Sequence, residues 1–119
     1  MKTYKSLLVW RKSIDLVEVV YRTTQNFPDS EKFGLLSQMR RCAVSIPSNI
    51  AEGHDRRSNK EFAYFLKVSF ASSSELETQL IIALRLKLIT KKQYDELTEQ
   101  ITYIRKMLSS LLSRISSGD

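Results

Sequence analysis

A regular apolar spacing in the last third of the chain limits what the sequence can fold into. Leucine or isoleucine recurs there at alternating intervals of four and three residues, at Leu97, Ile101, Ile104, Leu108, Leu111 and Ile115. This spacing keeps one face of an α-helix apolar and is typical of helices that pack at a shallow crossing angle. The sequence therefore predicts a helix over residues 91–115, opened by the capping pattern Thr90-x-x-Gln93.

Three earlier segments show similar patterns and predict helices over residues 7–25, 31–52 and 59–88. The expected core stripe of the first segment is Trp10, Ile14, Val17 and Tyr21. That of the second is Met39, Ala43, Ile46 and Ile50. Asp29 or Ser30 is the expected cap of the second helix and Gly53 its end, while Ser58 and Glu61 form a capping box before the third.

Turn-forming residues are scarce in this chain. Three glycines and two prolines in 119 residues are too few for a many-stranded β fold. Pro47 falls inside the second segment, but the apolar stripe keeps its phase on both sides, which favours one kinked helix. We therefore predict an all-α, single-domain fold over residues 1–119, an up-down-up-down antiparallel four-helix bundle.

The positive charge is concentrated in the first half of the chain. The net charge is +6, and residues 1–60 hold eleven Lys or Arg against six Asp or Glu. The candidate phosphate-binding residues are Arg40, Arg41, Arg56, Arg57 and Lys60, because arginine donates two parallel hydrogen bonds and helix N-termini attract anions. A solvated basic surface without a ligand is the alternative.

Catalytic and cofactor motifs are missing from the sequence. His54 and Cys42 are the single histidine and cysteine, no Glu-x-x-His pair suits a di-iron centre, and there is no phosphate loop or dinucleotide fingerprint. We expect no enzymatic activity, no cofactor and no bound metal. One cysteine, a short apolar stretch at the N-terminus and no long apolar run predict a cytoplasmic protein without a membrane anchor.

Several motifs together point to a known family. They are SIPSNIAEG at residues 45–53, Val9-Trp10, Phe27-Pro28 and ELETQL at residues 75–80. With them the sequence resembles the bacterial four-helix-bundle family called 23S rRNA intervening-sequence proteins. The resemblance implies a ring-shaped homopentamer. Some members are encoded within insertions in ribosomal RNA genes, and a related branch is the accessory protein of diversity-generating retroelements, linked to nucleic acid and reverse transcriptase.

A ring built from head-to-tail contacts needs two different patches on each subunit. The candidates are Val44, Pro47 and Ala51 on the second helix, and Leu16 and Val20 on the first. The expected function is that of a non-catalytic homo-oligomer that binds structured RNA or DNA through its phosphates. The alternative is a protein–protein scaffold, for example for a polymerase or reverse transcriptase, with no direct nucleic-acid role. Binding by such a scaffold should survive moderate salt.

Overall fold

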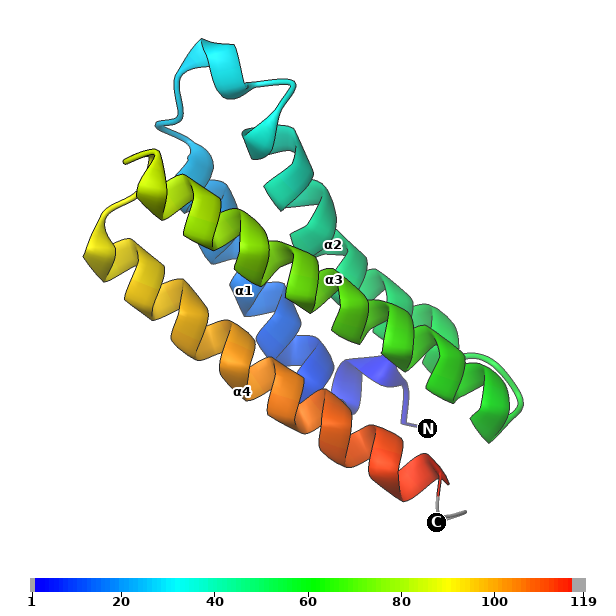
Figure 1. Cartoon of the computed structure of the whole chain (residues 1–119). Helices are drawn as coiled ribbons and strands as arrows, with labels where there is room; N and C mark the ends of the chain where they lie inside the picture. Colours follow the sequence, from blue (N-terminus) through cyan, green and yellow to red (C-terminus); the bar gives the residue numbers. More distant parts are fainter. Residues whose placement is uncertain (1, 117–119) are drawn as a thin grey trace.

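The computed structural model describes residues 2–116, which form four long α-helices (Figure 1). These are α1 (Leu8–Thr24), α2 (Leu35–His54), α3 (Asn59–Arg85) and α4 (Lys91–Ser116). Short 3-10 helices, η1 (Tyr4–Ser6) and η2 (Asp29–Glu31), precede α1 and α2, and no strand occurs within residues 2–116. The helices form an elongated bundle of 46 × 22 × 21 Å in which α1 contacts both α2 and α4. The predicted four-helix bundle is thus confirmed.

The predicted stripes of the second and fourth helices lie in the core. Met39, Ala43, Ile46 and Ile50 of α2 are fully buried. The α4 residues named above are buried as well, apart from Leu111, which is half-buried against the core. Helix α2 also runs without interruption through Pro47, so the prediction of one helix is confirmed. Spacing alone located these two faces because apolar side chains occupy nearly every inward position.

The predicted stripe of the first helix was wrong by about one position. The buried face of α1 consists of Val9, Ser13, Leu16, Val20, Thr23 and Thr24, whereas Trp10, Ile14 and Val17 are half-buried and Tyr21 is exposed. Three buried residues with hydroxyl groups, Ser13, Thr23 and Thr24, make this face less hydrophobic in the sequence than it is in the packing. Ser13 Oγ donates to the Trp10 carbonyl at 2.7 Å and Thr24 Oγ1 to the Val20 carbonyl at 2.8 Å. Because the helix itself accepts these hydrogen bonds, both side chains can be buried.

Two of the predicted helix starts are confirmed by their capping contacts. The Glu61 N–H donates to Ser58 Oγ at 3.1 Å, and the Gln93 N–H donates to Thr90 Oγ1 at 3.1 Å. The third is corrected, because α2 begins at Leu35 and neither Asp29 nor Ser30 caps it. There the Leu35 N–H donates to Glu31 Oε1 at 3.3 Å. Residues 29–31 form η2 instead, so the chain turns before α2 begins.

Helix α3 ends at Arg85, three residues earlier than predicted. Lys87 adopts a positive φ of 60°, the left-handed conformation that commonly ends a helix. The Lys87 N–H donates to the Leu84 carbonyl at 3.0 Å and the Leu88 N–H to the Ala83 carbonyl at 2.9 Å. This pair of bonds is the Schellman motif. The position was missed because a lysine, not a glycine, occupies it.

Gly53 has a different role from the predicted one. It lies inside α2 and is buried, and the helix continues to His54. A Cβ atom at this position would stand 2.6 Å from Phe65 Cβ and 3.0 Å from Phe62 Cδ1 on α3. The glycine therefore allows α2 and α3 to approach each other closely near the turn that joins them.

Candidate nucleic-acid interface

The five candidate phosphate-binding residues form two groups rather than one patch. Arg40 and Arg41 lie in the first half of α2, while Arg56, Arg57 and Lys60 lie at the turn into α3. The part of α2 from Arg41 to His54 is about 20 Å long at about 1.5 Å per residue. The two groups are therefore separated by about 20 Å along the axis of α2, whose course Figure 1 shows.

Arg40 is engaged within the chain. Its Nε donates to Thr24 Oγ1 at 2.9 Å and its Nη2 to the Tyr21 carbonyl at 3.2 Å. The guanidinium also lies 4.4 Å from the centre of the Tyr21 ring. These contacts hold the carboxyl end of α1 against α2, where a positive charge is favourable. Arg40 thus acts first as a structural residue, although its charge remains near the surface.

Arg56 also has partners within the chain. Its Nη2 contacts Glu52 Oε1 at 3.0 Å, and its guanidinium lies 4.9 Å from the centre of the Phe65 ring. The nearby N-terminus of α3 is less available to an anion than expected. Ser58 Oγ already accepts the Glu61 N–H and donates to the carboxylate of Glu61 at 3.2 Å. A negative side chain therefore already occupies the first turn of α3.

Three cations of the predicted set remain open to solvent. Arg41, Arg57 and Lys60 are exposed, and none of them makes a hydrogen bond or ion pair with another described residue. Exposed ion pairs contribute little stability, and a cation without one has its full charge available to an external anion. These three residues are the part of the predicted site that the structure leaves free to bind phosphate.

The residues predicted for a subunit interface fall into a buried group and a group that reaches the surface. Leu16 and Val20 are fully buried in the bundle and Pro47 is buried within α2, so these three predictions are wrong. The shift of the α1 stripe explains the first two, since the residues taken for an outer flank form its inner face. Val44 is 39% exposed and Ala51 is half-buried. These two remain on the outer side of α2.

The structure also contains a groove that no sequence pattern predicted. Its volume is about 810 Å³, and it lies between the end of α1, η2 and the beginning of α2. Phe33 stands at this groove and is 89% exposed, while Lys32, Arg40 and Arg41 also line it. One signal could have revealed Phe33. If α2 were extended backwards from Met39 as a regular helix, Phe33 would lie about 120° around the helix axis from the apolar stripe. A large aromatic residue at that position would face away from the core.

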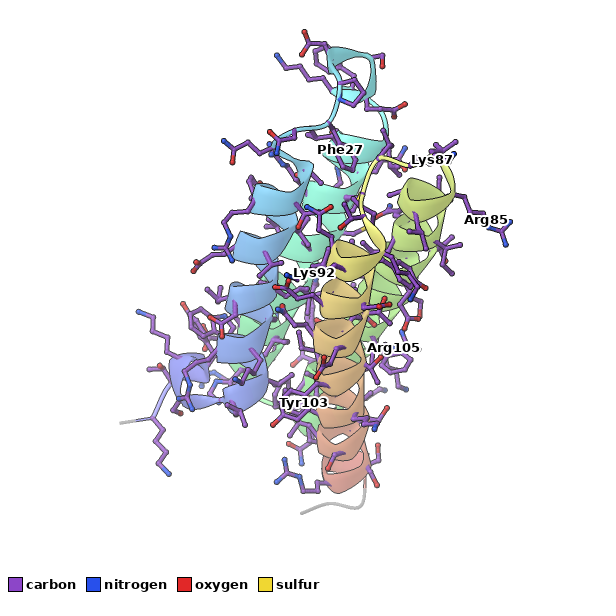
Figure 2. The ribbon with its side chains drawn as sticks, turned by 90° about the vertical axis from the view of Figure 1, so that its left-hand side faces the viewer. Phe27, Arg85, Lys87, Lys92, Tyr103 and Arg105 are labelled. Carbon is purple, nitrogen blue, oxygen red and sulfur yellow. The ribbon has the colours of Figure 1, made fainter. Side chains whose placement is uncertain are left out.

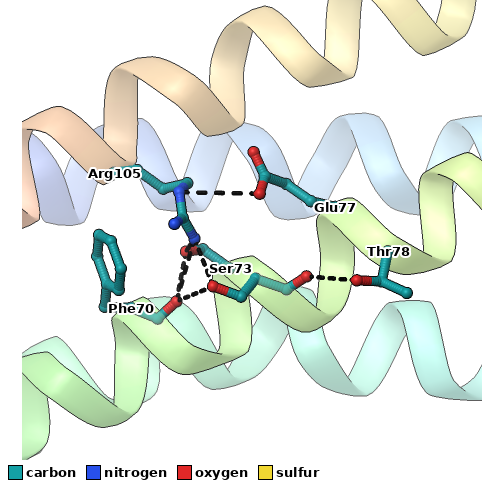
Figure 3. A network of polar contacts seen from close by, with 6 residues as sticks. Phe70, Ser73, Glu77, Thr78 and Arg105 are labelled. Atoms are coloured by element: carbon teal, nitrogen blue, oxygen red, sulfur yellow. Dashed lines mark hydrogen bonds and ion pairs between the residues drawn. The ribbon is translucent and has the colours of Figure 1, made fainter.

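Arg105 carries a third set of polar contacts, but these are internal (Figure 3). Its Nη1 donates to Ser73 Oγ at 2.8 Å and to Ser74 Oγ at 2.7 Å, and its Nε lies 3.9 Å from Glu77 Oε1. The guanidinium also covers the Phe70 ring at 4.0 Å. These contacts hold α4 against α3, and they leave Arg105 few N–H groups that could donate to a ligand.

The groups that could carry chemistry are placed as follows. Cys42 is buried, and burial raises the pKa of its thiol above the ordinary value of 9.0. The ring of His54 packs edge-on against Phe62. Within residues 2–116 no three His, Cys, Asp or Glu side chains are close enough together to hold a metal ion. In the same range no helix is long and apolar enough to cross a membrane.

Fold and surface together define an antiparallel four-helix bundle with exposed cations in the first half of its second helix and at the turn that follows it. The model of the 23S rRNA-intervening sequence protein family matches residues 5–110, and the chain belongs to that family. A solved structure supports the same fold, a protein of unknown function from the S23 ribosomal protein family of Bacteroides thetaiotaomicron. It is 27% identical, with a TM-score of 0.80, and the match covers 88% of this chain and 98% of that one. A search of curated proteins found no match.

Proposed function

We propose that this chain is a non-catalytic homo-oligomeric protein that binds structured nucleic acid through phosphate contacts from its exposed cations. The observation that carries the proposal is that Arg41, Arg57 and Lys60 are exposed and unpaired within the described residues of a chain with a net charge of +6. Binding energy in such a contact comes from released counterions and does not require base reading.

The spacing of the cations suits a long polyanion better than a small one. Arg41 and the group at Arg57 and Lys60 are separated by about 20 Å of helix. Phosphates follow one another at about 3.4 Å along each strand of a duplex, so one nucleic acid of six or seven base steps reaches both groups. A single small phosphate compound reaches one group only.

Assembly into a homo-oligomer is part of the proposal, and the family resemblance favours a pentamer. Two exposed apolar regions support it. One is on α2, where Val44 is exposed and Ala51 is half-buried, and the other is at the end of α3, where Ile81, Ile82 and Leu86 are exposed. Two different patches are what a head-to-tail ring requires. In a ring, repeated weak phosphate contacts act together and raise the apparent affinity.

The exposed apolar end of α3 also favours the second candidate function. Ile81, Ile82 and Leu86 suit a protein–protein scaffold that receives a partner such as a polymerase or reverse transcriptase. Binding through this surface should persist at moderate salt and should not depend on Arg41, Arg57 or Lys60. The two candidates therefore predict different salt dependences.

The test is the salt dependence of binding to a 20-base-pair duplex RNA or DNA, measured by fluorescence anisotropy. A variant with Arg41→Gln, Arg57→Gln and Lys60→Gln should flatten the slope of log Kd against log salt by two to three, at about 0.9 for each DNA phosphate that is no longer neutralised. The matched control changes three exposed cations around the α3–α4 turn to Gln, namely Arg85, Lys87 and Lys92 (Figure 2). An equal flattening in both variants indicates net charge alone and contradicts the proposed site.

A further inference from the structure

The most exposed aromatic residue of the bundle lies beside its cations. Phe33 is 89% exposed, and the ammonium group of the neighbouring Lys32 lies 5.7 Å from the centre of its ring. Core packing does not explain this side chain, because folding buries almost none of its surface. A large aromatic face held in solvent is the kind of surface that a ligand covers.

The segment that carries Phe33 is ordered by its own contacts. The Glu31 N–H donates to the Pro28 carbonyl at 2.9 Å, the Lys32 N–H to the Asp29 carbonyl at 3.1 Å, and the Gly34 N–H to the Glu31 carbonyl at 3.1 Å. Before this turn, Phe27 is buried in the core and anchors the loop at the end of the bundle (Figure 2). Phe33 is therefore presented by a fixed turn rather than by an unsupported loop.

The charge of the groove selects the kind of ligand. Lys32, Arg40 and Arg41 line it together with a single carboxylate, Asp29. The same surface of a second copy carries the same excess of positive charge and is repelled. An anion with flat apolar faces matches both the cations and the exposed ring. Nucleic acid has this combination, with phosphates for the cations and base faces for Phe33.

Base pairing decides which form of nucleic acid can reach the ring. In a duplex both faces of each base are already stacked, and an aromatic side chain reaches them only by unstacking the helix. Unpaired nucleotides in loops, bulges or ends expose these faces and stack on Phe, Tyr or Trp. Tyr21 lines the same groove and is 42% exposed, so it offers a second aromatic ring. The guanidinium of Arg40 lies beside this ring.

We propose that the groove between α1, η2 and α2 binds unpaired nucleotides, with a base stacked on Phe33 and the adjoining phosphates beside Lys32 and Arg41. The inference rests on the proposed nucleic-acid function and adds to it a preference for unpaired segments. The duplex contacts at Arg57 and Lys60 do not depend on it.

The experiment compares two labelled ligands, a 15-nucleotide oligouridine and a 15-base-pair duplex RNA, by fluorescence anisotropy at one salt concentration. Base stacking on an aromatic side chain is sequence-tolerant and substantial, so Phe33→Ala should weaken oligouridine binding roughly 5- to 100-fold and change duplex binding less than about twofold. Phe33→Trp should restore the affinity. The matched control is Tyr103→Ala, which removes a 48% exposed ring beside Asp15, Glu96 and Glu99 and should change neither affinity.

The possible failures are distinguishable. If the wild-type protein binds both ligands and Phe33→Ala binds them equally well, the stacking site is overturned and the phosphate-binding function stands. If the wild-type protein binds neither ligand, the proposed function itself fails. A loss of both affinities together with a lower mass by light scattering places Phe33 in a subunit contact and overturns the stacking site. Unchanged circular dichroism of Phe33→Ala confirms that the exposed ring is not needed for folding.

Discussion

Replacing Gly53 by alanine should destabilise the protein because it forces two packed helices apart. The added methyl group would stand 2.6 Å from Phe65 Cβ, well inside van der Waals contact. Phe65 Cβ is attached directly to the backbone of α3, so no change of rotamer moves it away. The helices themselves must shift, and the contacts around the α2–α3 turn shift with them.

Two opposing effects set the size of this change. Overpacking of a close contact costs about 1–3 kcal/mol. Alanine is a better helix former than glycine and recovers up to about 1 kcal/mol. Because the clash involves an atom that cannot rotate away, we expect a net loss of about 1–2 kcal/mol in the free energy of unfolding. For a chain of this size that corresponds to a Tm lower by about 4–8 °C.

The assay is thermal unfolding followed by circular dichroism at 222 nm, at one protein concentration because assembly would shift the Tm. The control is Ser48→Ala, on the exposed side of α2, which gains helix propensity without a clash and should leave the Tm unchanged or slightly raised. A Tm for Gly53→Ala equal to or above that of Ser48→Ala would refute the close-approach role of this glycine.

Two further substitutions test other parts of the structure. Lys87→Gly should raise the Tm by about 2–4 °C, because glycine adopts the positive φ of 60° without the side-chain cost; an equal rise with Lys87→Ala would point to the removed charge instead. Cys42→Ala should remove a pH dependence of stability. Burial raises the thiol pKa in the folded state, so the folded protein holds this proton more tightly. The contribution of the thiol to the free energy of unfolding is complete at pH values below its ordinary pKa of 9.0. This contribution is lost as the pH rises toward the raised pKa of the folded state. Denaturant unfolding at pH 7.5 and 10 should therefore show a larger loss for the wild type than for Cys42→Ala, and parallel losses would contradict this.

The sequence predicted the helices well where apolar side chains mark both the face and the ends. Helices α2 and α4 have nearly unbroken stripes, and Ser58 and Thr90 carry clear capping patterns. The phase of α1 was missed because Ser13 and Thr24 are buried with their hydroxyls bonded to their own helix. A pattern of hydrophobic residues does not show that a hydroxyl group can be buried when its own helix accepts its hydrogen bond.

The candidate site was harder to predict, because its availability depends on tertiary contacts. Adjacent arginines in the sequence have different roles, since Arg40 reaches back to Thr24 of α1 while Arg41 points to solvent. Phe33 falls within the helix predicted over residues 31–52, whereas the structure places it before α2. Phe33 lies between η2 and the late start of α2 at Leu35, where the Leu35 N–H donates to the Glu31 side chain.

The central claim is that several copies of this chain join and present their unpaired cations to nucleic acid. Light scattering combined with absorbance at 260 and 280 nm tests it directly on untagged protein purified at low salt. We predict a particle with the mass of several 13.8 kDa chains and excess absorbance at 260 nm that high salt removes. A single 13.8 kDa species at micromolar concentration with a pure protein spectrum would contradict the claim.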